Sequence, residues 1–176
     1  MGPFSPDRYF SRVSRIDVDR DLLGRGLRFV FLDIDNTIRR RDNREVPIDV
    51  RAWIGRAREK GSVVCLLSNN CHADVYDLAD ELGLPIVAKA MKPLAFGFFR
   101  AMRMCGASAS ESVMVGDQIC TDVVGAKLVG MKSYLIAPLV EQDLPHMAAL
   151  RRAERKMMGD RIPEGASTSV SAQARE

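Results

Sequence analysis

The 176-residue sequence predicts an α/β fold in which a parallel sheet carries helices on both faces. Between about residue 28 and residue 137, short runs rich in β-branched residues alternate with segments whose apolar residues recur at helical spacing. Parallel neighbours in a sheet need crossover connections, which are right-handed and usually helical, so this alternation favours the parallel arrangement. Glycines follow two of the expected helices and separate each from the next strand.

The first half of the alternating region is expected to hold two strands and two helices. A helix over residues 47–60 places four apolar residues on one face, namely Val50, Trp53, Ile54 and Ala57. Gly61 is suited to end this helix because glycine tolerates a left-handed backbone, and Gly83 ends the second helix in the same way. In chain order we expect a strand at 28–32, a helix at 47–60, a strand at 62–67 and a helix at 73–82.

The second half repeats the pattern with three further strands. Pro93 suits the first position of a helix, where the N–H that proline lacks would have no intrahelical partner. This helix is expected to turn Leu94, Phe98 and Met102 inward. In chain order we expect a strand at 85–88, a helix opening at Pro93, a strand at 113–115, a helix at 121–129 and a strand at 133–136.

The chain length corresponds to one domain with short additions. The segment after residue 140 has the pattern of a separate amphipathic helix, and the final residues are small and polar, as in disordered tails. The organisation we expect is an N-terminal arm at 1–27, the α/β domain at 28–140, a C-terminal helix at 141–160 and a disordered tail at 161–176.

Composition excludes several classes of protein. The hydrophobic fraction of 47% and the charged fraction of 28% are ordinary for a globular protein, and no apolar run is long enough to span a bilayer. The N-terminus lacks the basic, apolar and small-residue segments of a secretory signal, and the four cysteines form no CxxC pair. We therefore expect reduced thiols and a cytoplasmic location.

The net charge of +3 is weak evidence for binding to nucleic acid. No nucleic-acid partner is expected, although Arg39, Arg40 and Arg41 are clustered.

Polar residues follow each of four expected strands, where open α/β sheets bind their ligands. Asp33 and Asp35 follow the first strand, and two carboxylates so close together cost Coulomb energy and desolvation unless a cation or a reaction uses them. Taken alone, each motif is more typical of a turn, a helix cap or a solvated side chain than of a site. Their order along successive strands favours function; after Asp33 and Asp35 come Ser68 with Asn69, then Lys92, then Asp117 with Asp122.

Other candidate motifs carry less weight. Gly24 and Gly26 precede the first strand instead of following it, so a dinucleotide-binding fingerprint is unsupported, and the sequence has no P-loop. His72 lies near Ser68 and either touches substrate or simply enters a helix.

The four motifs DIDNT, LLSNN, KP and GDQICTD resemble those of the haloacid dehalogenase superfamily of phosphohydrolases. The segment FSPDRYFSRVSRIDVDRDLLGRGLRFVFLDIDNT, with SNN and KAMKP, looks more narrowly like the YqeG-type branch of subfamily IIIA, which is similar to phosphatidylglycerophosphate phosphatases. The resemblance implies a Rossmann-like fold and an Mg²⁺-dependent phosphomonoester hydrolase that works through an aspartyl-phosphate.

The resemblance also implies a role for each candidate residue. Asp33 would be the nucleophile and Asp35 the general acid and base. Mg²⁺ would bind Asp33, the main-chain carbonyl of Asp35 and Asp117. The phosphate-binding candidates are Ser68, Asn69 and Lys92, Asp122 would orient Lys92 or a metal-bound water, and Asn36, Thr37 and Asn69 would also shape the loops.

The spacing between motifs bears on the substrate. The stretches from Asp33 to Ser68 and from Ser68 to Lys92 are filled by ordinary helices and strands, so no cap domain is expected. An open site suits a phosphomonoester presented by a surface, such as a lipid head group, and a soluble nucleotide or sugar phosphate remains the alternative.

The N-terminal arm is basic and contains the apolar residues Phe10 and Val13. It is expected either to touch a membrane peripherally or to pack on the sheet.

Two readings without turnover are also open. A receiver-like phosphoacceptor would be expected to carry its acceptor aspartate after the third strand, where this sequence has Lys92. A binding protein without catalytic activity would not need the complete set of candidate catalytic residues, which are Asp33, Asp35, Ser68, Lys92 and Asp117.

Overall fold

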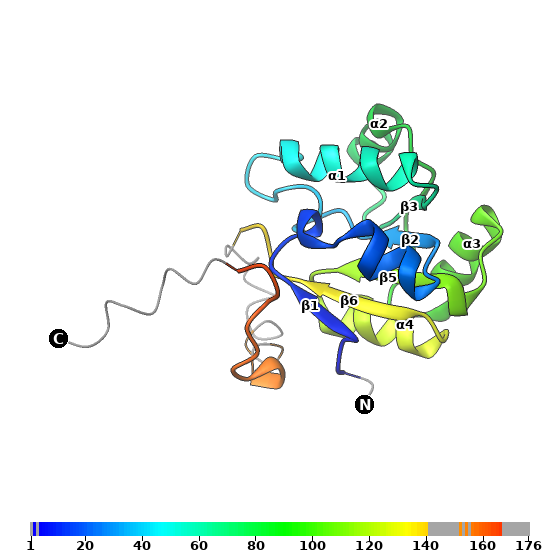
Figure 1. Cartoon of the computed structure of the whole chain (residues 1–176). Coiled ribbons are helices and arrows are strands. Elements are labelled where there is room, and N and C mark those ends of the chain that lie inside the picture. Colours follow the sequence, from blue (N-terminus) through cyan, green and yellow to red (C-terminus); the bar gives the residue numbers. More distant parts are fainter. Residues whose placement is uncertain (1, 3, 141–151, 153, 155, 167–176) are drawn as a thin grey trace.

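The computed structural model describes residues 2, 4–140, 152, 154 and 156–166. Its centre is a six-stranded, entirely parallel sheet in the order β1-β6-β5-β2-β3-β4, which confirms the predicted α/β class (Figure 1). The strands are β1 (Arg8–Phe10), β2 (Phe29–Leu32), β3 (Val63–Leu67), β4 (Ile86–Val87), β5 (Ser112–Gly116) and β6 (Lys132–Ile136).

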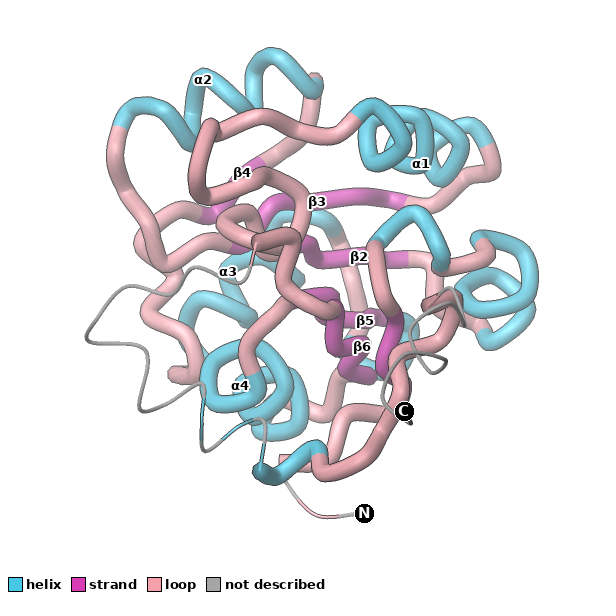
Figure 2. The backbone as a smooth tube through the Cα atoms, turned by 90° about the vertical axis from the view of Figure 1, so that its left-hand side faces the viewer, coloured by secondary structure: helices cyan, strands magenta, loops and turns pink. Residues whose placement is uncertain are grey.

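Helices cover the two faces of this sheet. Figure 2 shows α1 and α2 on one side of the strands and α3 and α4 on the other. The helices are α1 (Ile48–Glu59), α2 (Ala73–Leu82), α3 (Ala95–Cys105) and α4 (Val124–Leu128). Short helical turns span Val13–Arg15, Val18–Leu22, Leu23–Arg25, Ala109–Glu111 and Ile119–Val123.

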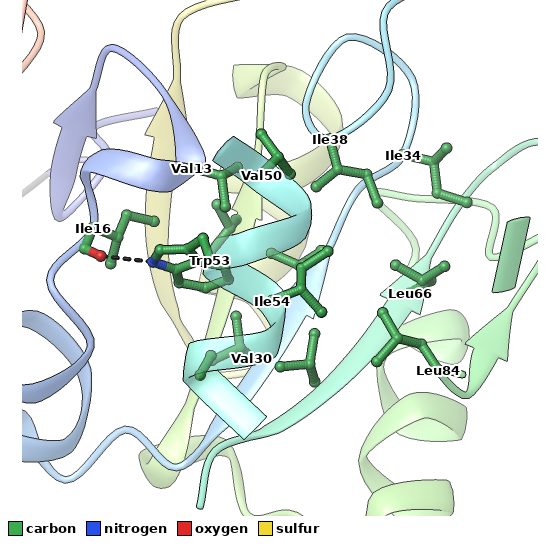
Figure 3. Close-up of a cluster of buried hydrophobic side chains, with 14 of the residues drawn as sticks. Val13, Ile16, Val30, Ile34, Ile38, Val50, Trp53, Ile54, Leu66 and Leu84 are labelled. Atoms are coloured by element: carbon green, nitrogen blue, oxygen red, sulfur yellow. Dashed lines mark hydrogen bonds between the residues drawn. The ribbon is translucent and has the colours of Figure 1, made fainter. Parts of the chain in front are cut away.

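The larger half of the core lies between the sheet and α1. Trp53 of α1 is almost fully buried, and its indole Nε1 donates a hydrogen bond to the carbonyl oxygen of Ile16 at 2.7 Å (Figure 3). Val30 of β2 and Leu66 of β3 pack in the same cluster, so alternate residues of the central strands face α1. The other face buries Phe31 and Cys65 beneath Phe98 of α3.

Residues 8–27, which belong to the expected N-terminal arm, complete the edge of the sheet and its core. β1 pairs in parallel with β6, and Phe10 and Val13 are 1% and 0% exposed. Arg8 stacks over the Phe10 ring at 4.5 Å and forms an ion pair of 2.5 Å with Asp21. Of the two expectations for this segment, packing on the sheet is therefore the correct one for Phe10 and Val13.

The opening of α3 differs from the sequence prediction. The helix begins at Ala95, not at Pro93, and Leu94 has an extended backbone with φ −61° and ψ 138°. Because Leu94 precedes the helix, it does not share the inward register of Phe98, and 59% of its surface is exposed. The inward placement predicted for Leu94 is wrong, whereas Phe98 and Met102 are buried as predicted.

The C-terminal helix expected at 141–160 and the tail expected at 161–176 lie partly outside the described residues. Where described, residues 152, 154 and 156–158 have helical backbone. The backbone of Glu164 donates a hydrogen bond to the Tyr9 carbonyl and accepts one from the Ser11 amide, so it lies along the outer edge of β1. Among the described residues, no helix has the length and apolar character needed to cross a bilayer.

Candidate active site

Four neighbouring strands end beside one another, and each is followed by a candidate residue. Asp33 directly follows β2, Ser68 follows β3, Lys92 lies five residues after β4, and Asp117 follows β5. Because these strands are parallel and adjacent in the sheet, their carboxyl ends meet at one edge. All four of these polar side chains belong to buried residues.

A lysine joins two of the aspartates. The Nζ atom of Lys92 lies 2.6 Å from Oδ1 of Asp33 and 2.7 Å from Oδ1 of Asp122. The hydroxyl of Thr37 makes longer contacts, at 3.4 Å to each of Asp33 and Asp117. The sequence-predicted residues Asp33, Lys92, Asp117 and Asp122 thus form one buried charged cluster.

The electrostatics of this cluster are dominated by burial. Burial raises the pKa of Asp33 to about 7; the carboxylates of Asp122 and Asp117 add to the rise, while Lys92 opposes it. Burial by itself would lower the pKa of Lys92, but the carboxylates of Asp122 and Asp33 outweigh it and hold the pKa above its ordinary value. Lys92 is therefore a fixed positive charge, and its attraction for the Asp33 carboxylate offsets only part of the effect of burial and of the two neighbouring carboxylates.

Asp33, Asp117 and Asp122 can each place one carboxylate oxygen within 4.8 Å of the others. Three buried carboxylates face a single ammonium group, so the cluster carries excess negative charge that a cation would offset. Carboxylate oxygens are the ligands that hard divalent cations prefer. The donor set therefore fits a divalent metal ion.

Asp122 reaches the cluster because residue 116 is a glycine. A Cβ atom on Gly116 would lie 2.2 Å from Oδ2 of Asp122, which is far closer than atoms approach without a bond. The same Oδ2 accepts a hydrogen bond of 3.1 Å from the backbone N–H of Gln118. The turn after β5 thus fixes Asp122 against Lys92.

Asp35 lies apart from the three clustered carboxylates. Its Oδ1 accepts a hydrogen bond of 2.5 Å from Arg39, and Asn70 Nδ2 lies 3.5 Å from its Oδ2. The backbone turns sharply at Asn36, whose φ of 69° is in the left-handed region that asparagine tolerates. This turn directs the carboxyl group of Asp35 toward the loop at 39–44.

The loop after β3 holds the lysine in place. The side chain of Asn69 donates to the Lys92 carbonyl at 3.0 Å and accepts from the Lys92 amide at 2.6 Å. The hydroxyl oxygen of Ser68 is buried and accepts a hydrogen bond from the Asn70 amide at 3.1 Å. Asn69 thus acts on the main chain of Lys92, as its loop-shaping interpretation implies.

His72 and Arg39 differ in their exposure to solvent. His72 is exposed and stands at the start of α2, where its backbone amide donates to Asn70 Oδ1 at 2.9 Å. Arg39, one of three consecutive arginines in the sequence, is 4% exposed and bridges Asp35 and Asp74, the latter at 2.7 Å. The signal available in the sequence was the four-residue separation of Asp35 and Arg39.

Comparison with known proteins identifies relatives over most of the chain. A model of the haloacid dehalogenase-like hydrolase family matches residues 8–130. A probable phosphatase, YqeG, of Bacillus subtilis (strain 168) is 29% identical over 155 residues, which are 88% of this chain and 90% of that protein. A ribulose-1,5-bisphosphate 5-phosphatase of Halopiger xanaduensis is 35% identical over 65 residues, which are 37% of this chain and 27% of that protein.

Solved structures share the fold at lower identity. The cobalt-bound deoxy-D-mannose-octulosonate 8-phosphate phosphatase of Haemophilus influenzae superposes with a TM-score of 0.52 at 15% identity, covering 76% of this chain and 88% of that one. An uncharacterised protein of Listeria monocytogenes has a TM-score of 0.52 at 19% identity, covering 68% and 85%.

Proposed function

Since this chain belongs to the haloacid dehalogenase-like hydrolase family and acts as a phosphatase, we propose that it hydrolyses phosphomonoesters through a phosphorylated Asp33, with Mg²⁺ as its metal. The observation that carries this proposal is the position of Asp33 at the end of β2, in contact with Lys92 and beside two further buried carboxylates. A nucleophile needs a cation beside it, because phosphomonoesters are anionic and repel a carboxylate.

The reaction is proposed to run in two displacements at phosphorus. A carboxylate oxygen of Asp33 forms a bond to phosphorus while the bond to the leaving oxygen breaks, and Asp35 gives its proton to that oxygen. Asp35 then takes a proton from water as the water oxygen bonds to phosphorus, which breaks the acyl-phosphate bond and frees phosphate. Lys92 and Ser68 bind the phosphoryl oxygens, and Asp122 positions Lys92 through the 2.7 Å contact.

Mg²⁺ is proposed to bind the carboxylates of Asp33 and Asp117 and the main-chain carbonyl of Asp35. When bound, the ion supplies positive charge that offsets both the phosphate and the crowded carboxylates. Asp122 is already engaged by Lys92 and by the Gln118 amide, so we assign it to positioning.

Phosphatidylglycerophosphate is the proposed substrate. The segments between β2 and β3 and between β3 and β4 contain only loops, α1 and α2, so no cap covers this side of the site. Four exposed apolar residues lie close to Lys92 in the chain, just before α3 and in its first turns, and we call them the α3 surface. They are Met91, Leu94, Phe96 and Phe99, which are 45%, 59%, 56% and 56% exposed. α3 contains two arginines and no acidic residue, a composition suited to an anionic lipid surface.

A soluble phosphate ester is the second candidate. The observation that favours it is the sequence similarity to a ribulose-1,5-bisphosphate 5-phosphatase, although the match spans only 27% of that protein. A panel of phosphatidylglycerophosphate, sugar phosphates and nucleotides separates the two candidates by kcat/KM.

We expect Phe96→Ser combined with Phe99→Ser to lower kcat/KM on phosphatidylglycerophosphate in anionic vesicles by about tenfold or more, because burying an aromatic side chain contributes about 1.5–3 kcal/mol. The change on glycerol phosphate is expected to be much smaller. Ile48→Ser is the matched control, since Ile48 is 85% exposed on α1. If Ile48→Ser lowers kcat/KM on the lipid as much as the combined Phe96→Ser and Phe99→Ser variant does, the lipid is removed from the proposal. A higher kcat/KM on a soluble ester than on the lipid has the same consequence.

Asp35→Asn tests the general acid. The nucleophile remains in this variant, but the proton for the leaving oxygen is lost, and a positioned acid or base contributes about 10²- to 10⁴-fold. We expect a large loss on an alkyl phosphate and a smaller loss on p-nitrophenyl phosphate, whose leaving group needs no proton. Equal losses on the two substrates would contradict the role of Asp35.

A further inference from the structure

A cavity of about 260 Å³ opens beside Asp35, on the side where its carboxyl group meets Arg39. Three arginines and two aspartates contribute to its wall. The residues that line it are Asp35, Arg39, Arg41, Arg44, Asn70 and Asp74.

The arginines of this cavity are unequally paired. Arg39 binds Asp35 and Asp74 at 2.5 and 2.7 Å, and Arg44 lies 3.4 Å from Asp74. Arg41 has no ion pair or hydrogen bond with another described residue, and its Nη1 atom is buried without a partner. The Nε atom of Arg39 is likewise buried and unpartnered. Two buried guanidinium donors thus remain without an acceptor, which is costly unless a ligand supplies one.

The cavity lies where the proposed role of Asp35 places the alcohol part of the substrate. A general acid must touch the oxygen that leaves, so the alcohol part of the substrate lies on the side of Asp35 that faces away from phosphorus. The cavity opens next to this carboxyl group, and Asn70, which also contacts Asp35, forms part of its wall. The alcohol part of the substrate is therefore the group that the cavity can receive.

We propose that the cavity binds a second anionic group on the alcohol part of the substrate, with Arg41 as its main ligand. This inference rests on the proposed role of Asp35. It narrows the substrate to phosphomonoesters whose alcohol carries a phosphodiester, a second phosphate or a carboxylate. Guanidinium groups suit such acceptors because they donate paired hydrogen bonds to planar or tetrahedral oxyanions.

Propane-1,3-diol bisphosphate and propyl phosphate test the proposal, because they differ by the second anionic group. In the wild-type protein the bisphosphate is expected to have the lower KM. Arg41→Ala is expected to lower kcat/KM for the bisphosphate by about tenfold or more through KM. The loss on propyl phosphate should be several-fold smaller, and Arg41→Lys should restore part of the difference. Arg56→Ala is the control, since Arg56 is exposed on α1 outside this cavity.

Binding is measured separately from turnover by calorimetric titration of the Asp33→Asn variant, with and without Arg41→Ala. A loss of affinity for the bisphosphate that exceeds the loss for propyl phosphate supports the cavity, even if no variant turns either compound over. Equal losses on both compounds, or no loss on the bisphosphate, overturn the inference while leaving the phosphatase assignment intact.

Three further compounds distinguish the source of the second anion. Glycerophosphoglycerophosphate carries a phosphodiester, a sugar bisphosphate carries a second phosphate, and 3-phosphoglycerate carries a carboxylate. The compound whose KM depends most on Arg41 identifies the acceptor. If none of the three depends on Arg41 more than propyl phosphate does, the inference is wrong.

Discussion

Asp33→Asn is expected to abolish turnover, with a loss of about 10⁴-fold or more, because an amide is a poor nucleophile and the first displacement has no substitute. The variant should keep its fold, since Lys92 retains its 2.7 Å contact with Asp122. Rates on p-nitrophenyl phosphate measure the loss. Mass spectrometry after acid quenching should find phosphate on the peptide containing Asp33 in the wild-type protein.

Thermal unfolding provides the control for this variant, together with Asp77→Asn at an exposed site on α2. The folded pKa of Asp33, about 7, exceeds the ordinary value of 3.8 because of burial. A raised carboxyl pKa stabilises the fold at low pH, and that contribution is lost as the pH rises from about 4 to about 7. In the presence of a chelator, the free energy of unfolding of Asp33→Asn should therefore rise relative to that of the wild-type protein as the pH increases over this interval. More than a few per cent of the wild-type rate in a folded variant would require another nucleophile.

The fold could be predicted from the sequence wherever residues close in the chain set the pattern. The buried residues of α1 recur at helical spacing; they are Val50, Trp53, Ile54 and Ala57. The strand before Asp33 is a continuous apolar run. β1 could not be predicted because it has three residues and pairs with β6, more than a hundred residues away. A strand that short has no period of its own to detect.

The candidate site could likewise be predicted only in part. Asp33, Lys92 and Asp117 could be placed together because parallel strands bring their carboxyl ends to one edge. Arg39 could not be separated from its neighbours Arg40 and Arg41, since three consecutive arginines suggest a solvated surface. Only the turn at Asn36, which brings Arg39 between Asp35 and Asp74, shows that one of the three is buried.

The negative charge of the buried cluster predicts that activity depends strongly on a metal ion. Removal of divalent metal by a chelator is expected to lower activity by about 10²-fold or more, since a metal supplies several kcal/mol of charge stabilisation and each factor of ten corresponds to about 1.4 kcal/mol. Added Mg²⁺ should restore the rate. Ca²⁺ should restore it poorly, because Ca²⁺ takes longer bonds and more ligands than Mg²⁺.

Asp117→Asn separates metal binding from other effects of the chelator. The variant keeps the volume of the side chain but removes one of the three clustered carboxylates, so it should need a higher Mg²⁺ concentration for activity. Mg²⁺ should raise the melting temperature of the wild-type protein and raise that of the variant less, because ion binding to the folded state adds to its stability. Full activity in protein shown by elemental analysis to be metal-free would exclude the metal, and Lys92 alone would then have to balance the charge at Asp33.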